Sequence, residues 1–286
     1  MYTLTELEKQ AVTVIKLAAA AAADKGQTLE LCYSGGKDSE VMRVLAIMAG
    51  VPFEAIYKQT TIDRPFTTMY CQSRHVTILR PPVTFLDLVR KKGYPTRRCR
   101  WCCERFKEFK VRDVALVGVR RDESRARRNR YTDFDQCRVY HRGGSCQQFF
   151  PLLNWSELDE LDFIRQNALE LHPHYYDDNG QLVITRRLGC LCCPLRGDNG
   201  RGDFQEYPKM LKQWLLAGID WYSANPQRKT CQKFSHPAKL LLHNLFCRSY
   251  QEYYDRFEHS IFGFSNDEAI KVLELKFSVD LSDVPR

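Results

Sequence analysis

The stretch that decides the fold is Leu29-Glu-Leu-Cys-Tyr-Ser-Gly-Gly-Lys-Asp-Ser39. Residues 29–33 alternate like a short buried strand, and an apolar run with helical spacing follows from Val41 to Gly50. A glycine pair between a strand and a helix lets backbone N–H groups turn toward an anion, and the helix N-terminus adds partial positive charge there. The stretch therefore predicts a phosphate-binding loop at the end of a strand.

The residues of this loop are expected to contact phosphate or its metal ion: Ser34, Gly35, Gly36, Lys37, Asp38 and Ser39. The two hydroxyls can donate hydrogen bonds, and Lys37 can neutralise charge on the phosphates. Asp38 is placed to cap the helix or to approach a bound Mg²⁺. The loop is not a Walker A motif, because Asp38 stands where that motif requires Ser or Thr. A plain strand-to-helix turn without a ligand is the alternative.

Strand and helix patterns alternate on either side of the loop. An amphipathic helix is expected from Thr3 to about Asp24, and a further helix over 85–92. Further strand candidates lie at 53–57, 75–79 and 114–119. Alternation of this kind predicts an α/β fold, a mainly parallel twisted sheet with helices on both faces. We expect one nucleotide-binding domain over 1–203 and a C-terminal helical extension over 204–286.

Charge and hydropathy narrow the class of protein. The 43 Lys and Arg residues exceed the 35 Asp and Glu residues by 8, which favours phosphate-bearing partners without separating nucleotides from nucleic acids. No apolar run reaches the roughly 18 residues of a membrane span, and the alanine-rich stretch at 18–23 does not have the pattern of a secretory signal. We expect a cytoplasmic protein with no membrane partner. Because the cytosol is reducing, the 12 cysteines favour metal or redox chemistry over disulfides.

The cysteines include an adjacent pair and a Cys-x-x-Cys pair. Thiolates are the ligands of iron–sulfur centres, and two sulfurs from each pair are enough for a [4Fe–4S] cluster. The predicted ligands are Cys102, Cys103, Cys190 and Cys193. Cys99 or Cys192 is an alternative for one of them, and a structural zinc site with the same ligands or a set of inert buried cysteines is an alternative to the cluster.

Six arginines fall between Arg120 and Arg130, directly after a strand candidate. Ligands bind at the carboxyl ends of strands in such sheets, and a guanidinium can hold two phosphate oxygens at once. For the outer arginines, Arg127, Arg128 and Arg130, a solvated charged surface and contact with a nucleic-acid backbone are the alternatives to recognition of the ligand phosphates.

Taken together, these motifs resemble the phosphoadenosine-phosphosulfate reductase family of the N-type ATP pyrophosphatase superfamily, whose SGGxDS loop holds the phosphates of ATP. Further stretches similar to the family occur in the same order: Thr60-Thr-Ile-Asp63, Arg100-Trp-Cys-Cys-Glu-Arg-Phe-Lys107, Gly118-Val-Arg-Arg-Asp-Glu-Ser-Arg125, Pro151-Leu-Leu-Asn-Trp155 and Tyr175-Tyr-Asp177. The resemblance covers about residues 27–196. It implies an adenine nucleotide alpha hydrolase-like fold that binds ATP or a related adenylyl nucleotide.

The resemblance also assigns roles to residues. It adds Asp63 to the nucleotide-binding loop residues. It implies that the catalytic set is Lys37, Asp38, Arg120 and Arg125, with the lysine and the arginines as phosphate clamps. Cluster-bearing members of the family support the iron–sulfur assignment.

The chain departs from the assimilatory reductases of the family, which carry a catalytic cysteine in a Glu-Cys-Gly-Leu-His-type tail. The last two cysteines here, Cys231 and Cys247, do not match that motif. In character the chain is closest to the ATP pyrophosphatases of DNA phosphorothioation systems and is similar to sulfur-inserting tRNA enzymes. This resemblance implies that ATP adenylylates an acceptor, a nucleic acid, before a sulfur donor such as a cysteine desulfurase displaces AMP.

Several alternatives remain at this point. Other subunits of a modification system are expected partners, and Cys137 or Cys146 is a candidate persulfide carrier. Reduction of phosphoadenylyl or adenylyl sulfate to sulfite is the second function. A nucleotide-sensing subunit whose partners perform the chemistry is the third.

Overall fold

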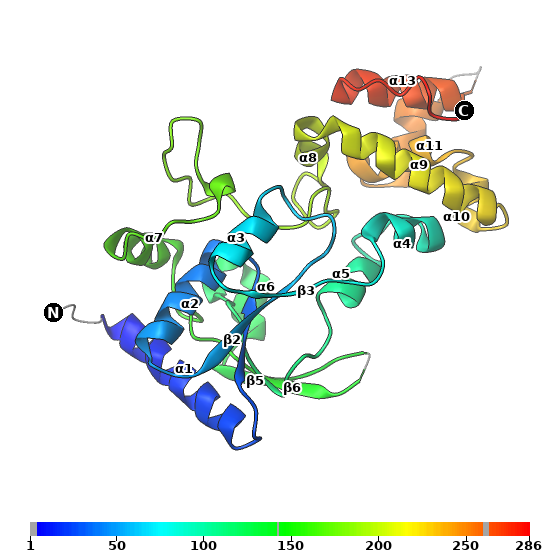
Figure 1. Ribbon diagram of the computed structural model, residues 1–286. Coiled ribbons are helices and arrows are strands. Elements are labelled where there is room, and N and C mark those ends of the chain that lie inside the picture. The colour runs from blue at the N-terminus through cyan, green and yellow to red at the C-terminus, as the bar shows by residue number, and fades with distance from the viewer. Residues whose placement is uncertain (1–4, 142, 260–262) are drawn as a thin grey trace. The chain divides into compact units, whose positions relative to one another are not determined.

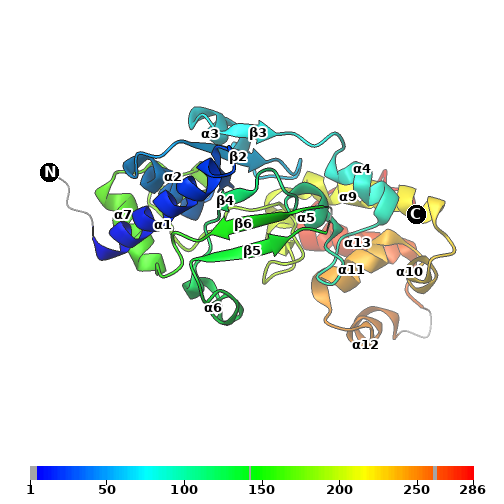
Figure 2. The same ribbon diagram turned by 90° about the horizontal axis from the view of Figure 1, so that it is seen from below.

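A six-stranded sheet organises the computed structural model, which describes residues 5–141, 143–259 and 263–286 (Figure 1). The strands are β1 (Leu29–Tyr33), β2 (Phe53–Lys58), β3 (Thr77–Leu79), β4 (Val114–Leu116), β5 (Asp135–Val139) and β6 (Ser145–Phe149). Their order is β3-β2-β1-β4-β6-β5. All neighbouring pairs are parallel except β5 and β6, which form the antiparallel hairpin visible in Figure 2. The predicted α/β class with a mainly parallel sheet is confirmed.

The strand order places the loop after β1 at the point in the sheet where the chain connections diverge. From β1 the sheet continues through β2 on one side and through β4 on the other. The chain connections therefore diverge at β1, and the carboxyl ends of β1 and β4 border a crevice. This topology brings the loop at residues 34–39 beside the segment that follows β4.

One face of the sheet is covered by α1 (Glu6–Ala23) and α2 (Lys37–Met48), which lie side by side (Figure 1). Leu29, Leu31 and Tyr33 of β1 are buried against them in the main hydrophobic core. The predicted first helix is confirmed from Glu6 onward, where the Thr5–Glu8 capping box starts it. The expected start at residues 3 and 4 lies outside the described residues.

The opposite face of the sheet carries polar groups at β1 and β2. The carboxylate of Glu30 accepts a hydrogen bond from the Arg112 backbone N–H at 3.1 Å, and Lys58 Nζ donates to the Phe109 carbonyl at 2.7 Å. An irregular segment around residues 109–112 therefore covers this part of the sheet.

The remaining helices of the described chain are mostly short. They are α3 (Thr67–Ser73), α4 (Phe85–Lys92), α5 (Trp101–Phe106), α6 (Arg125–Arg130), α7 (Glu157–Gln166), α8 (Arg201–Glu206), α9 (Pro208–Ala224), α10 (Lys229–Lys233), α11 (Pro237–Phe246), α12 (Tyr250–Tyr253) and α13 (Asn266–Phe277). The 3₁₀ turns η1 (Arg121–Glu123) and η2 (Pro173–Tyr175) and the π-helical turn η3 (Tyr254–Glu258) complete them. Of the helices in the described ranges, none has the length and apolar character needed to cross a membrane.

The contacts divide the chain into two compact units. The first, Met1–Pro81 with Glu104–Gly189, holds the sheet. The second, Pro82–Cys103 with Cys190–Arg286, is helical and has Trp214 at the centre of its aromatic core, packed against Phe85, Tyr94 and Phe204. The boundary predicted between residues 203 and 204 falls inside α8 and remains a prediction about folding domains.

Candidate active site

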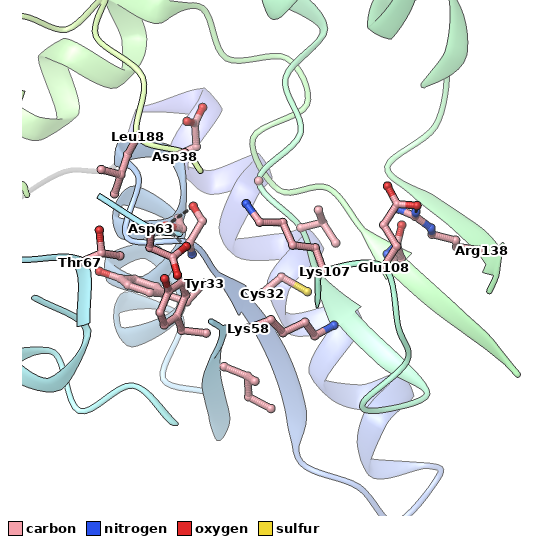
Figure 3. A pocket seen from close by; sticks show the side chains of 18 of the residues that line it. Cys32, Tyr33, Asp38, Lys58, Asp63, Thr67, Lys107, Glu108, Arg138 and Leu188 are labelled. Carbon is pink, nitrogen blue, oxygen red and sulfur yellow. Dashed lines mark hydrogen bonds and ion pairs between the residues drawn. The ribbon is translucent and has the colours of Figure 1, made fainter. Parts of the chain in front are cut away.

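A cavity of about 380 Å³ lies at the carboxyl ends of β1 and β2 in the first unit (Figure 3). The loop residues Ser34, Asp38 and Ser39 line it, together with Asp63 after β2 and Gly118 after β4. Its charged lining comprises Asp38, Asp63, Glu108, Glu123, Lys58, Lys107, Arg127 and Arg138. Cavities of this size hold small polar ligands, so the loop predicted from the sequence faces a space in which a ligand can bind.

The loop is held in shape by its own serines. Ser39 Oγ donates to the Gly36 carbonyl at 2.7 Å and accepts from the Ser34 N–H at 3.2 Å, while Gly36 N–H donates to Ser34 Oγ at 3.2 Å. Gly35 has a φ of 76°, and a Cβ there would lie 3.1 Å from the Leu188 side chain, so a glycine is required for both reasons.

Helix α2 begins at this loop without a side-chain cap. Its N-cap is Gly36, which has no side chain to accept a hydrogen bond from the first turn. The first N–H groups of a helix lack partners within the helix and favour an anion there. One of them is already engaged, since the Lys37 N–H donates to the buried Tyr175 hydroxyl at 3.1 Å.

Beneath the loop, four charged side chains form one network. Lys37 Nζ donates to Glu160 Oε2 at 2.8 Å, and Arg120 Nη2 lies 3.2 Å from the same oxygen. Arg120 Nε donates to Asp38 Oδ1 at 2.7 Å. Lys37, Arg120 and Glu160 are 4%, 3% and 0% exposed, whereas Asp38 also borders the cavity. The network therefore connects the loop with α7 and with the segment after β4.

The network shifts the two carboxyl groups in opposite directions. Burial raises the pKa of Glu160 to about 8, and the negative charge of Asp38 adds to this increase, while Lys37 and Arg120 oppose it. Burial also acts to raise the pKa of Asp38, but the positive charges of Lys37 and Arg120 outweigh it, so the net pKa of Asp38 is lowered. Asp38 is thus kept ionised and Glu160 favours its protonated form.

The segment after β4 approaches the loop closely. A Cβ added to Gly118 would lie 3.3 Å from the Asp38 Cβ and 3.5 Å from its backbone carbon. Two residues later, Arg120 reaches Asp38 with its guanidinium. The motif Gly118-Val-Arg120 therefore combines a close backbone approach with an ion pair to one loop residue.

Asp63 closes the turn after β2. Its carboxylate accepts hydrogen bonds from the Thr60 N–H at 2.8 Å and from Thr60 Oγ1 at 2.7 Å. Figure 3 shows Asp63 and Thr67 on one side of the cavity and Arg138 with Glu108 on the other. The turn thus places a carboxylate across the cavity from the Arg138–Glu108 ion pair.

The predicted site residues do not all reach the cavity. Arg125 is exposed at the start of α6 and does not line it, whereas Arg127 does and forms an ion pair with Glu123. The Lys37 side chain points into the buried network instead of the cavity lining. Glu160 was not predicted, although it is an acid on the buried stripe of α7 with Phe163 and Ile164, which is a recognisable signal.

The cysteine pairs both belong to the second unit. Hydrogen bonding with Cys103 raises the pKa of the Cys102 thiol, and burial and the nearby Cys103, Cys190 and Cys193 raise it further, so these four thiols are neighbours. By contrast, Cys99 is exposed, and Cys192 is buried.

The donor set suits a cluster, but the arrangement is not that of bound ligands. Within the described ranges, no three His, Cys, Asp or Glu side chains are arranged to hold a metal ion. Four thiols from two chain segments are nevertheless the chemistry that iron–sulfur centres use. The ligand set therefore stays a prediction.

Part of this chain is similar in sequence to curated proteins. Sulfate adenylyltransferase subunit 2 of Nocardia farcinica is 28% identical over 209 residues, 60% of this chain and 67% of its own length. An uncharacterized protein of Methanocaldococcus jannaschii is 27% identical over 232 residues, 74% of this chain and 53% of its own length. The chain thus spans about half to two thirds of the length of these curated relatives.

A structure of phosphoadenylyl-sulfate reductase from Candida auris aligns with a TM-score of 0.40 and 17% identity, over 59% of this chain and 90% of that one. The family profile described as the phosphoadenosine phosphosulfate reductase domain matches residues 28–196, which is more than half of the chain. The chain therefore belongs to the phosphoadenosine phosphosulfate reductase domain family.

Proposed function

We propose that this protein is an ATP pyrophosphatase that adenylylates an acceptor for sulfur transfer. The observation that carries the proposal is the loop at residues 34–39, which lies between a strand and an uncapped helix at the edge of a cavity. An acceptor oxygen would attack the α-phosphorus of ATP, and pyrophosphate would leave. A sulfur nucleophile from a donor would then attack the activated centre, and AMP would leave with that oxygen.

The cavity and the loop suit a triphosphate. The start of α2 lacks a side-chain cap, and the Ser34 hydroxyl lies beside it, whereas the Ser39 hydroxyl donates its proton to the Gly36 carbonyl. Donors of this kind recognise phosphate oxygens. The sulfate adenylyltransferase subunit among the relatives is named for the transfer of an adenylyl group, which is the same class of reaction.

The charged network suits the departure of pyrophosphate, because negative charge accumulates as it leaves. Lys37, Arg120 and an ionised Asp38 leave one net positive charge when Glu160 is protonated. Arg120 Nη1 is buried without a hydrogen bond from the described residues and lies 4.0 Å from the Asp122 carboxylate, and because Arg120 does not line the cavity, the loop would have to shift for it to reach a phosphate. We propose Arg120 as a phosphate clamp. Lys37, which contacts the same Glu160 oxygen, would add positive charge beside it, and Arg125 would reach the phosphates only after the nucleotide binds.

Mg²⁺ would accompany the triphosphate. Asp38 is the carboxylate of the loop that borders the cavity and has a lowered pKa, so it can present oxygen ligands to a hard cation. When bound, the ion would neutralise charge on the phosphate oxygens.

The sulfur-transfer part of the proposal rests on the cysteines of the second unit. Cys102, Cys103, Cys190 and Cys193 would hold a [4Fe–4S] cluster, which when bound supplies redox or sulfur-handling chemistry. A nucleic acid is the proposed acceptor, consistent with the net charge of +8. A cysteine desulfurase and further subunits of a modification system are the proposed partners.

Sulfonucleotide reduction is the second candidate, favoured by the family. It requires a reactive thiolate, yet burial raises the pKa of both Cys231 and Cys247, so their thiolates are disfavoured. A nucleotide-sensing subunit is the third candidate, since the same loop would serve binding without turnover.

The test is product analysis with anaerobically purified protein. We expect Mg²⁺-dependent pyrophosphate and AMP formation from ATP when a nucleic-acid acceptor and a sulfur donor are supplied. Sulfite formation from phosphoadenylyl or adenylyl sulfate with thioredoxin would overturn the proposal in favour of reduction. ATP binding with no turnover under any of these conditions would favour the sensing subunit.

A further inference from the structure

A basic segment lies outside the cavity, at residues 90–100 of the second unit. It contains six cationic residues and no acidic residue: Arg90, Lys91, Lys92, Arg97, Arg98 and Arg100. All six are exposed, and only Trp101 separates the segment from the Cys102–Cys103 pair. The last turn of a helix favours cations, which accounts for the first three at the end of α4 but not for the three arginines that follow.

Part of this basic segment is fixed in place. Gly93 has a φ of 77°, and a Cβ there would lie 2.9 Å from the Trp221 ring. Tyr94 is buried, and its hydroxyl donates to the Trp214 carbonyl at 3.0 Å. Arg97 donates to the Arg196 carbonyl at 2.6 Å and to Asn199 Oδ1 at 3.2 Å. The backbone is therefore anchored, so binding a ligand would not require ordering a loose chain.

The other cations divide into paired and unpaired groups. Arg90 forms ion pairs with Asp87 and Asp220, and Lys92 lies over the Trp101 ring. Lys91, Arg98 and Arg100 have no acidic partner within the described parts of the chain. Three exposed, unneutralised cations on an anchored backbone are a surface suited to a polyanion.

We infer that the basic segment binds the phosphate backbone of a nucleic acid. Arginine and lysine contacts with phosphates bind without regard to sequence and release condensed counterions. A nucleic-acid backbone offers evenly spaced charges to such a surface, whereas acidic protein surfaces are interspersed with cations. This inference adds to the proposed function a docking surface for the nucleic-acid acceptor. It rests on the proposed function only where the reaction is concerned, because nucleic-acid binding can be measured without ATP.

The test compares two triple variants of the full chain by fluorescence anisotropy, with labelled duplex DNA and single-stranded RNA over a range of KCl concentrations. One variant is Lys91→Gln with Arg98→Gln and Arg100→Gln. The control, Lys16→Gln with Lys25→Gln and Arg165→Gln, removes the same charge from exposed positions in the first unit. We expect the first variant to bind roughly tenfold or more weakly, with a salt slope reduced by about 2–3, and the control to stay near wild type.

Three results would overturn the inference. Equal losses in the two variants would show that net charge alone is responsible. Unchanged binding in the first variant would place the nucleic acid elsewhere. Binding of poly-glutamate with no binding of either nucleic acid would assign the segment to an acidic protein partner. Because ATP is absent throughout, a failed pyrophosphate assay would leave the binding result intact, and circular dichroism would confirm that both variants fold.

Discussion

Lys37 Nζ lies 2.8 Å from Glu160 Oε2, and both side chains are buried. The lysine of the phosphate loop thus contacts an acid on α7 that is 123 positions away in the sequence, and it does not line the cavity. Arg120 contacts the same carboxylate and also Asp38, so the loop, α7 and the segment after β4 share one electrostatic network. Substitution of either Lys37 or Glu160 should therefore affect this network.

Lys37→Met should destabilise the protein. It removes the donor of a buried hydrogen bond to Glu160 Oε2, and a buried polar group left without its partner typically lowers the free energy of unfolding by about 1–3 kcal/mol. Urea denaturation measures this change. Lys16→Met, on the exposed side of α1, is the control and should change it by less than about 0.5 kcal/mol. A loss as small as the control's would show that the pair adds nothing to stability.

Glu160 predicts a dependence of stability on pH. Because its pKa is raised from 4.5 to about 8 in the folded state, the native protein binds the proton more tightly than the unfolded chain does. The free energy of unfolding should therefore fall as pH rises from about 4.5 to about 8. Asp38 has a lowered pKa, and its contribution to stability is lost only as pH falls below the ordinary value of 3.8 for this group, outside this window.

Glu160→Gln should abolish this part of the pH dependence, because glutamine cannot titrate. Urea denaturation at a series of pH values measures it. Glu6→Gln, whose carboxylate is 89% exposed, is the matched control and should leave the profile unchanged. A wild-type profile that is flat between pH 5 and pH 8, or one that keeps its slope in Glu160→Gln, contradicts the assignment to this residue.

The sequence predicted the strand, loop and helix around residues 29–50 because that signal is local: glycines, serines and apolar spacing all lie within one stretch. It did not predict β5 and β6, whose residues are mostly polar and show no alternation of apolar and polar types. Nor did it predict the grouping of residues 82–103 with the C-terminal helices. That grouping depends on packing such as Gly93 against Trp221, between positions far apart in the chain.

The residues of the site also divide into those with a local sequence signal and those without one. The loop residues and Asp63 were all predicted from the sequence. Ser34, Asp38, Ser39 and Asp63 line the cavity, whereas the two glycines and Lys37 do not. Glu160 was missed because its partners come together only in the folded chain. The cavity cations Lys58 and Arg138 lie on strands in stretches with no phosphate-binding motif, so nothing local distinguished them from ordinary surface residues.

Asp38→Asn should strongly reduce turnover. The substitution keeps the size of the side chain but removes the charge that Arg120 contacts and that Mg²⁺ would need. Loss of one charged group in such a site typically costs about 10²–10³-fold in kcat. The assay is pyrophosphate release from ATP, and Asp24→Asn, at the exposed end of α1, should behave like wild type. Full activity in Asp38→Asn would exclude a catalytic role for this carboxylate.

Gly118→Ala should weaken nucleotide binding. Its new Cβ would lie 3.3 Å from the Asp38 Cβ and 3.5 Å from the Asp38 backbone, so the loop must shift. Isothermal titration with a non-hydrolysable ATP analogue should show roughly tenfold weaker binding, a change of about 1.4 kcal/mol. Gly197→Ala adds the same methyl group where no atom lies within 4 Å and should bind normally. Equal affinities for the two variants would mean that the close approach is unimportant.

Cys102→Ser should eliminate an iron–sulfur cluster. Replacing one thiolate removes a ligand, so anaerobically purified protein should lose its brown colour, its broad visible absorption and most of its iron. Cys137→Ser, on the exposed strand β5, should retain them. Cys99→Ser and Cys192→Ser decide the ligand set, since loss of iron in either would replace one proposed ligand. Zinc without iron in the wild-type protein would instead identify a structural zinc site, because zinc accepts the same four thiolates and has no colour.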